Sequence, residues 1–272
     1  MKEIRLICAA LALGLASTAW AASDSKATLT NFQFASTDLA PNDGIPPYFV
    51  WTAGFTGTTA YVTEGYGHWE TSTGNVGYNV YIPAGTTASN AHAWASAKTT
   101  GFGVVSPSFT AEGQSFGDPG NADYRANASL VNGPWWYDGS SLTIAPFTSV
   151  TISAVASLEA HDTIGITDSS FEYAAAFAAL QFQGAGSDGS GTQKSRQDLT
   201  ISQTAPGLLT QTALLSVTFE NLTSSPMVAT FSAQAGVMGT ANIAAVPEAS
   251  GAAMLLLGLG GLAAMGRRRK AV

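Results

Sequence analysis

The amino-acid sequence predicts an all-β domain, an antiparallel β-sandwich of the jelly-roll or immunoglobulin-like kind, between two processed ends. Hydrophobic residues make up 46% of the 272-residue chain and charged residues only 11%, so the chain can bury a sizeable core. Short runs rich in Thr, Val, Phe and Tyr alternate with Gly, Asn, Asp, Ser and Pro, as in strands joined by turns. Long helical patterns are scarce in the body of the chain, which favours a sandwich over a mixed fold.

Alternation of apolar and polar residues identifies the individual strands. Leu215, Val217 and Phe219 share one face, and the residues between them would face water. The segment 221–226 that follows is rich in Ser and Thr and ends in Pro, which predicts a hairpin loop between the last two strands. The clearest predicted strands are residues 28–34, 47–55, 58–62, 77–82, 141–144, 149–158, 199–203, 214–220 and 227–235.

Residues 171–182 fit both a helix and a strand. Their five alanines favour a helix. Phe171, Tyr173 and Phe177 follow a period of two, however, and β-like segments flank them, so we predict a strand. The Gly-rich and Ser-rich residues 184–191 cannot bury apolar surface and are predicted to form an exposed loop.

Residues 1–21 predict a secretory signal peptide. Two basic residues precede an apolar run, and Ala19 and Ala21 occupy the two positions that a signal peptidase reads. The run is too short to span a bilayer and is charged on one flank only. The single cysteine, Cys8, lies in this segment, so we expect no disulfide and no Cys-ligated zinc in the mature chain.

The last 27 residues divide into a short motif, an uncharged apolar segment and a basic tail. Sixteen helical residues rise about 24 Å, which is marginal for a hydrocarbon core of about 30 Å. Residues 252–265 carry no polar side chain, and the basic tail would hold the C-terminus in the cytoplasm. We therefore predict a single transmembrane helix over 251–266 and a basic stop in 267–272. The motif is Val246-Pro247-Glu248-Ala249-Ser250, and the stop contains Arg267, Arg268, Arg269 and Lys270.

This order of motif, Gly/Leu-rich span and Arg cluster resembles the PEP-CTERM sorting signal of exported proteins in Gram-negative bacteria. Ala249 stands where that signal usually has a second proline. The resemblance implies that an exosortase, a membrane Cys-dependent transpeptidase-like enzyme, recognises the motif, and that the tail holds the chain in the inner membrane until it is processed. Pro247 keeps Val246 out of the helical region, which would present an extended segment at the membrane surface.

The predicted organisation is a signal peptide over 1–21, a β-sandwich domain over 22–245 and a sorting signal over 246–272. Residues 37–47 and the late segment 219–223 are similar to stretches of uncharacterised PEP-CTERM proteins, which imply no activity for the body. Six of the 11 Lys and Arg residues lie in the two ends, whereas 16 of the 18 acidic residues lie in the body, which has a net charge of -11. Such a body repels phosphate backbones, so no nucleic-acid partner is expected.

The sequence contains no recognisable catalytic or metal-binding motif. His68, His92 and His161 lack the spacing of a metal site, and no nucleophile elbow occurs. We predict no catalytic residue and no cofactor. The carboxylates that could still converge into a glycosidase pair are Glu64, Glu70, Glu112, Asp118 and Asp123.

Two groups of residues suggest binding. The residue types of Asn42, Asp43 and Gly44 predict a turn, and a calcium site at Asp38, Asn42 and Asp43 is the alternative. The candidate sugar-binding residues are Trp135, Trp136 and Tyr137, because aromatic rings stack on sugars. Neighbouring residues of a strand point to opposite faces, so one of the two tryptophans is expected in the core.

These observations predict an exported protein that is anchored in the inner membrane as a precursor and then sorted to the cell surface or the extracellular matrix. Its expected role is structural or adhesive, in association with exopolysaccharide or biofilm. The alternative is a carbohydrate-binding module that uses exposed aromatic residues, and a secreted glycoside hydrolase is the third reading. The expected partners are an exosortase, the inner membrane and an exopolysaccharide.

Overall fold

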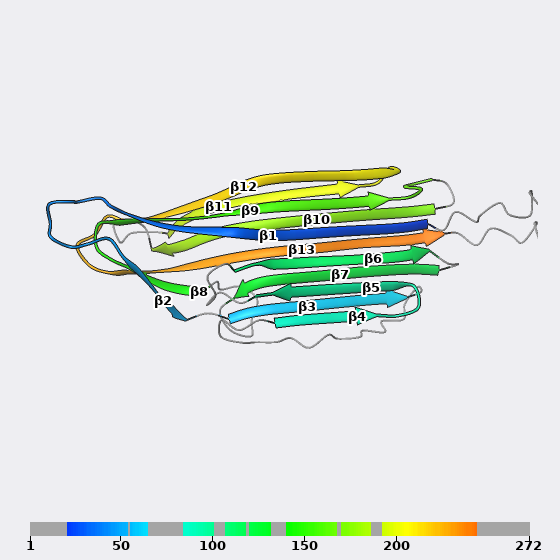
Figure 1. Ribbon diagram of the computed structural model, residues 1–272, viewed down its shortest axis with the longest axis horizontal. Helices are drawn as coiled ribbons and strands as arrows, with labels where there is room; N and C mark the ends of the chain where they lie inside the picture. The colour runs from blue at the N-terminus through cyan, green and yellow to red at the C-terminus, as the bar shows by residue number, and fades with distance from the viewer. Residues whose placement is uncertain are drawn as a thin grey trace, which may run out of the picture.

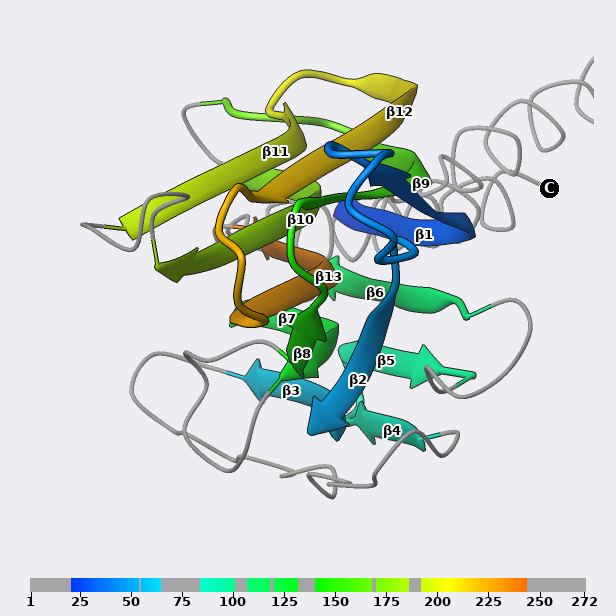
Figure 2. The same ribbon diagram turned by 90° about the vertical axis from the view of Figure 1, so that its left-hand side faces the viewer.

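The computed structural model describes residues 21–53, 55–64, 84–100, 107–117, 120–131, 140–167, 170–185 and 192–243, which form an elongated two-layer β-sandwich (Figure 1, Figure 2). Every element in these ranges is a strand, and every strand pairing is antiparallel. The predicted antiparallel β-sandwich is therefore confirmed. Within the same ranges no helix is long and apolar enough to cross a membrane. The predicted signal peptide and transmembrane helix lie outside the described residues.

The first layer is a six-stranded sheet with the order β12–β9–β1–β6–β5–β4. Its strands are β1 (Ala21–Asp38), β4 (Ala84–Ser89), β5 (Ala93–Thr99), β6 (Phe109–Gly117), β9 (Thr148–Asp162) and β12 (Gly207–Asn221). Asn31, with a φ of 54°, lies in an irregularity of β1 where its register with β9 shifts.

The second layer contains a five-stranded sheet with the order β11–β10–β13–β8–β2. Its strands are β2 (Phe49–Ala53), β8 (Ser140–Ile144), β10 (Ser170–Ala185), β11 (Thr192–Gln203) and β13 (Met227–Ile243). Within β13, only the first five residues pair with β8. The pair formed by β3 (Phe55–Glu64) and β7 (Gly120–Val131) completes this layer, because β7 lies along the rest of β13.

Alanine dominates the space between the two layers. Small inward side chains allow two sheets to pack closely face to face. The buried alanines of facing strands include Ala27, Ala60, Ala95, Ala97, Ala111, Ala126, Ala128, Ala154, Ala156, Ala174, Ala176, Ala178, Ala233 and Ala235. Tyr124 is the largest fully buried side chain among the described residues, and it lies against Gly113 of β6 and Gly239 of β13, where an added Cβ atom would overlap its ring.

Aromatic residues fill the interior toward the end of the sandwich that carries β2 and β8. Phe182 and Phe231 are cross-strand partners with ring centroids 5.1 Å apart, and Phe219 of the opposite layer lies 6.0 Å from Phe182. Trp51 closes this cluster edge-on against Phe231 at 6.0 Å. Edge-to-face and tilted pairs at these separations add to the stabilisation that burial provides.

The strand prediction for residues 171–182 is confirmed, since they form β10. Gly184 and Ala185, the first two residues of the predicted exposed loop 184–191, belong to β10, and residues 186–191 lie outside the described residues. Gly184 lies beside the Phe219 ring, where an added Cβ atom would come within 2.9 Å. Residues 47–55 do not form one strand: β2 ends at Ala53, and Phe55 begins β3, which has a different partner. The predicted strand 77–82 lies outside the described residues.

The hairpin predicted between the last two strands is wrong. β12 pairs with β9 in the six-stranded sheet, whereas β13 pairs with β10 in the other layer. Asn221 holds the crossing: its side-chain amide donates to the carbonyls of Ala145 and Ser225, each at 2.9 Å, and its Oδ1 accepts from the Thr223 backbone N–H at 3.0 Å. A buried amide with these partners stabilises an arch between layers rather than a hairpin.

Candidate functional site

The side of the six-stranded sheet that faces away from the second layer, called the outer face below, brings chemically diverse side chains into line. Alternation in each strand sends every second side chain outward. The antiparallel register then places six of them side by side across all six strands. This outer row consists of Leu208, His161, Asp24, Gln114, Trp94 and Ser89.

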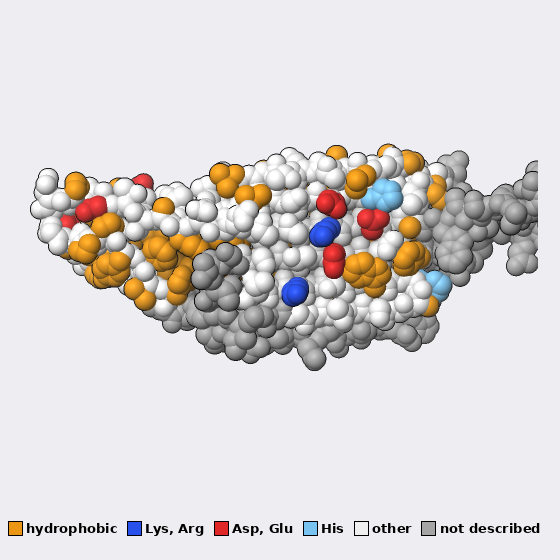
Figure 3. Space-filling view, viewed as in Figure 1, with side chains coloured by type: hydrophobic (Ala, Val, Ile, Leu, Met, Phe, Trp, Pro, Cys, Tyr) orange, Lys and Arg blue, Asp and Glu red, His pale blue; other side chains and the backbone are white. Residues whose placement is uncertain are grey.

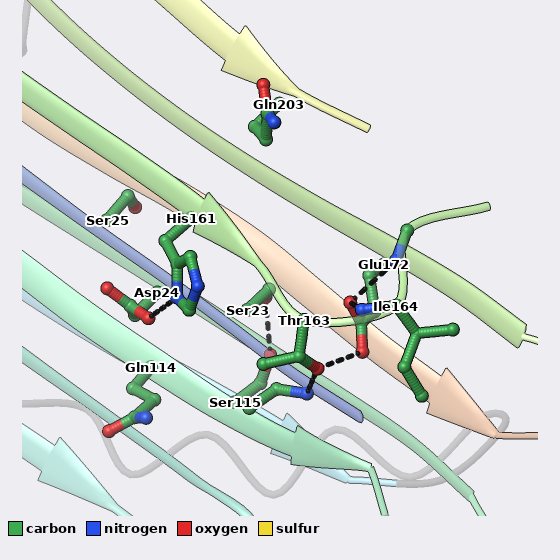
Figure 4. A network of polar contacts seen from close by, with 12 residues as sticks. Ser23, Asp24, Ser25, Gln114, Ser115, His161, Thr163, Ile164, Glu172 and Gln203 are labelled. Carbon is green, nitrogen blue, oxygen red and sulfur yellow. Dashed lines mark hydrogen bonds and ion pairs between the residues drawn. The ribbon is translucent and has the colours of Figure 1, made fainter. Parts of the chain in front are cut away.

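Hydrogen bonds orient the central members of the outer row. His161 Nδ1 lies 2.8 Å from Asp24 Oδ1 (Figure 4). Trp94 Nε1 donates to Gln114 Oε1 at 3.2 Å, which fixes the half-buried indole ring on the sheet surface. The row therefore combines an aromatic surface with carboxylate, imidazole and amide groups, all on rigid strands rather than on loops.

A second row of outward side chains lies next to the outer row. Lys26 is in register with Glu159 on one side and with Glu112 on the other, so a cation stands between two anions. Figure 3 shows this charged group, with imidazole and hydrophobic side chains near it, on a surface that is otherwise largely uncharged. Hydroxyl pairs continue the face, including Thr151 with Thr218 at 2.9 Å. The outer face can thus offer both donors and acceptors to a polar ligand.

A buried polar cluster lies inside the sandwich beneath the outer row (Figure 4). Glu172 accepts hydrogen bonds from Thr163 Oγ1 at 2.9 Å and from the backbone N–H groups of Ile164 at 2.6 Å and Gly165 at 2.9 Å. Thr163 Oγ1 in turn accepts from the Ala22 backbone N–H at 2.9 Å. Glu172 therefore ties the turn after β9 to the beginning of β1.

Other inward polar groups of this cluster form pairs. The hydroxyls of Ser23 and Ser115 are 2.9 Å apart, and those of Ser25 and Tyr124 are 2.7 Å apart. Asp162 is fully buried, and neither of its carboxyl oxygens has a hydrogen-bond partner among the described residues. An unpartnered buried carboxyl group disfavours its charged form.

The ionisation of two groups reflects this burial. The pKa of Asp162 is raised from 3.8 to about 7, first by desolvation and then by the nearby Glu172 carboxylate, while His161 acts in the opposite direction. Burial also raises the pKa of Tyr124 well above its ordinary value. Such shifts occur at active sites, but also in structural networks. Here Glu172 binds the backbone of a turn and Asp162 is not exposed, which indicates a structural network.

Of the five carboxylates considered for hydrolysis, the two whose side chains are described lie on different layers of the sandwich. Glu112 points outward from β6 on the six-stranded sheet, whereas Asp123 points outward from β7 on the opposite layer, where Thr63 Oγ1 donates to it at 3.0 Å. The thickness of the sandwich separates these two carboxyl groups. Glu70, Asp118 and the side chain of Glu64 lie outside the described part of the chain.

The predicted turn at residues 42–44 is confirmed, with a φ of 76° at Gly44. Asp38 Oδ1 accepts from the Ala40 N–H at 2.8 Å, and Asp43 Oδ1 accepts from the Ile45 N–H at 2.7 Å. These oxygens, offered above as calcium ligands together with Asn42, thus bond the turn backbone. No cluster of three or more metal-ligating His, Cys, Asp or Glu side chains occurs among the described residues.

The remaining candidates fall outside the described ranges. They are the aromatic residues Trp135, Trp136 and Tyr137, the sorting motif 246–250, the basic residues 267–270, the cleavage residue Ala19 and His68. Ala21 is the first residue of β1.

The outer row was not predicted from the sequence, and Trp94 is not among the aromatic residues that were selected as candidates for sugar binding. The alternation of Ala93, Ala95 and Ala97 with larger residues was the local signal for β5, and it places Trp94 on the outward side. The alignment of Trp94 with Gln114, and of Asp24 with His161, depends on pairing between strands distant in sequence, which no local pattern reveals.

The fold and the outer face define a class, an antiparallel β-sandwich with a polar and aromatic sheet surface. No family model matches the chain, and no curated protein matches it. Among solved structures, one from a study of carbohydrate-binding modules of the β-sandwich superfamily and their promiscuous specificity aligns with 78% of this chain and 95% of its own. Its identity is 12% and its TM-score is 0.15, a value too low to carry an argument.

Proposed function

We propose that this protein is an exported, non-enzymatic β-sandwich that binds an extracellular polysaccharide on the outer face of its six-stranded sheet. The outer row carries this proposal. Trp94 offers an aromatic surface on which a sugar ring can stack, and Asp24, His161 and Gln114 offer hydrogen-bonding groups for sugar hydroxyls. The outer row crosses all six strands of the sheet, an extent that suits an extended polymer chain better than a small molecule.

The proposed role in the matrix is adhesive and structural. The hydroxyl-rich surface beside the outer row extends the area over which a polymer can lie, and the pairing of Trp94 with Gln114 preorganises the aromatic ring. Ordering these groups before binding lowers the entropic cost of association. The separation of Glu112 from Asp123 gives no support to a hydrolytic reading.

Export and sorting form the second part of the proposal, and they rest on residues 1–21 and on the resemblance of residues 246–272 to a PEP-CTERM signal. The geometry of the folded part is compatible with a tether: β1 begins and β13 ends at the same end of the sandwich (Figure 1). A domain held from that end would leave the full length of its outer face available to a polymer.

The test of binding uses extracellular polysaccharide isolated from the cells that produce the protein. We expect Trp94→Ala to weaken binding at least tenfold, since truncating a tryptophan that is a binding hot spot costs about 2 kcal/mol or more. Tyr173→Ala is the matched control, because Tyr173 is a half-buried aromatic residue on the opposite layer. Its affinity should equal that of the wild type in a titration followed by calorimetry. Equal losses in the two variants, or no binding by the wild type, would contradict the proposal.

A further inference from the structure

β12 is an edge strand of the six-stranded sheet, and its two halves differ. It pairs with β9 along its whole length, which leaves its other edge facing away from the sheet. In the second half this edge is covered by β11, since the Ser216 N–H donates to Gln197 Oε1 at 2.6 Å and the Thr218 N–H donates to Ser195 Oγ at 3.4 Å. Exposed strand edges are usually protected in this manner or by charged residues.

Among the described residues, no segment covers the free edge of the first half of β12, and this half contains no charged residue. Residues 207–212 are all exposed, and Leu208 and Leu214 expose 63% and 65% of their surface. Backbone N–H groups two residues apart point to the same side of a strand. The N–H groups of Ser216 and Thr218 point away from β9, so those of the other even-numbered residues of β12 do so too. The N–H groups of residues 208, 210, 212 and 214 therefore point away from β9, along an edge that lies at the margin of the molecule (Figure 1).

The sequence of this edge is complementary to itself. When two copies run antiparallel about Gln211, residues whose numbers add up to 422 face each other, and each pair lies on the same side of the joined sheet. The pairs are then Leu208 with Leu214, Thr210 with Thr212, Leu209 with Ala213, and Gln211 with its own copy. Leucine thus meets leucine and threonine meets threonine on the outer side, which are favourable cross-strand pairs.

Charge also favours a second copy of this chain as the occupant. The body has a net charge of -11, so two copies repel each other overall. The chain has no charged residue between Asp198 and Glu220, and β12 therefore offers an edge along which two copies approach without like-charge contact. The covering by Gln197 and Ser195 from Ser216 onward limits the pairing to residues 208–214.

We propose that two copies of this chain associate through residues 208–214 of β12, which pair antiparallel about a two-fold axis at Gln211 and join the two six-stranded sheets into one. Each copy contributes the same residues, so the interface is isologous and closes as a dimer. Because paired residues share a side of the sheet, the two outer faces lie on the same surface of the dimer. This inference does not depend on what the outer face binds.

The first test measures the dissociation constant of the full-length chain by sedimentation equilibrium, in detergent if the chain requires it. In the double variant Leu208→Lys, Leu214→Lys, lysines face lysines across the axis, whereas in Leu208→Lys, Leu214→Glu each lysine faces a glutamate. Within one strand, residues 208 and 214 are about 20 Å apart and do not interact with each other. A difference in dissociation constant between the two variants therefore reports contacts with the partner copy. We expect the dissociation constant of the lysine-only variant to be about tenfold higher than that of the variant with lysine and glutamate. Equal constants, or a wild type that stays monomeric at every concentration, would overturn the proposal.

The second test locates the axis. Gln211 faces its own copy at a position where the two Cα atoms are about 4.5 Å apart, a distance that a disulfide can bridge. Full-length Gln211→Cys should form disulfide-linked dimers under mild oxidation, seen on a non-reducing gel. Gln183→Cys is the control, because Gln183 is exposed on the other layer and Cys8 is present in both variants. Cross-linking of both variants to the same extent, or of neither, would overturn the placement of the axis.

Discussion

At the scale of single residues, Glu172 and Asp162 are two buried carboxyl groups in one cluster with different surroundings. Glu172 accepts three hydrogen bonds, two of them from backbone N–H groups, whereas Asp162 accepts none among the described residues. Hydrogen bonds from backbone donors stabilise a carboxylate, and burial without them favours the neutral acid. The neutral form of Asp162 is therefore the form that the folded state tolerates best at mildly acidic pH.

This difference makes stability depend on pH. The pKa of Asp162 is about 7 in the folded chain and 3.8 in its ordinary state, so between these values the folded state holds a proton that the unfolded state has released. The unfolded state binds fewer protons in this window, and the free energy of unfolding falls as pH rises from about 4 to about 7. Asp162→Asn removes the titration while keeping the shape of the side chain.

We expect urea denaturation of Asp162→Asn to show less loss of stability between pH 4 and pH 8 than the wild type, by an amount on the order of a few kcal/mol. The charged groups that act on Asp162 are Glu172, Asp24 and His161, and all remain in this variant. Asp198→Asn is the control, because Asp198 is an exposed carboxylate on β11 beside Arg196. A variant with the same pH dependence as the wild type would show that Asp162 is not the responsible group.

At the scale of elements, the interior depends on small residues at defined positions of β6, β10 and β13. Gly113 and Gly239 leave room for the buried Tyr124 ring, whose hydroxyl group is held by Ser25 at 2.7 Å. Gly236 lies under Phe177, but that ring is half-buried on the outer side of β10 and can turn toward solvent. An alanine methyl group at Gly113 would therefore meet the fixed Tyr124 ring, whereas one at Gly236 would meet the movable Phe177 ring.

Gly113→Ala should lower the free energy of unfolding by about 3 kcal/mol, as in other overpacked cores. Gly236→Ala should lower it by about 1 kcal/mol or less, since alanine also restricts the unfolded chain. Chemical denaturation of both variants at one pH gives the comparison. Similar losses would mean that the Tyr124 ring can move aside as readily as the Phe177 ring.

Four strands of the interior were absent from the strands predicted by alternation, and they share a composition. The inward positions of β4, β5, β6 and β7 are mostly Ala, Ser, Thr and Gly. Such residues contrast weakly with their polar neighbours, and alanine has low intrinsic preference for strands. These segments become strands because the narrow space between two closely packed sheets accepts small side chains, which is a property of the assembled layers.

At the scale of the whole molecule, both ends of the folded chain leave from one end of the sandwich. Ala22 reaches Glu172 through Thr163, and Glu172 is the cross-strand partner of Ala241 near the end of β13. The predicted leader and sorting signal would thus both attach at this end. Cleavage near Pro247 would release the sandwich from the membrane without removing any described strand.

The mass of the protein recovered from the culture medium tests this processing. We expect an N-terminus at Ala22 and a C-terminus close to Pro247, so that the apolar segment and the basic tail are missing from the released form. Pro247→Ala should reduce release and leave more of the precursor in the membrane fraction, as measured by quantitative mass spectrometry. A released protein that retains Arg267 to Lys270 would contradict sorting through this motif.

The sequence by itself determined the class of the fold, because apolar residues at every second position mark the buried face of a strand within a short segment of sequence. It also determined the turn at Gly44, where only the residue types matter, and it carries all the observations on which export is proposed. It did not determine which strands become neighbours. Tertiary structure decided that β12 and β13 belong to different layers, because β12 pairs with β9 and β13 pairs with β10. It also aligned Trp94, Gln114, Asp24 and His161, since register depends on pairing energies between strands far apart in the chain.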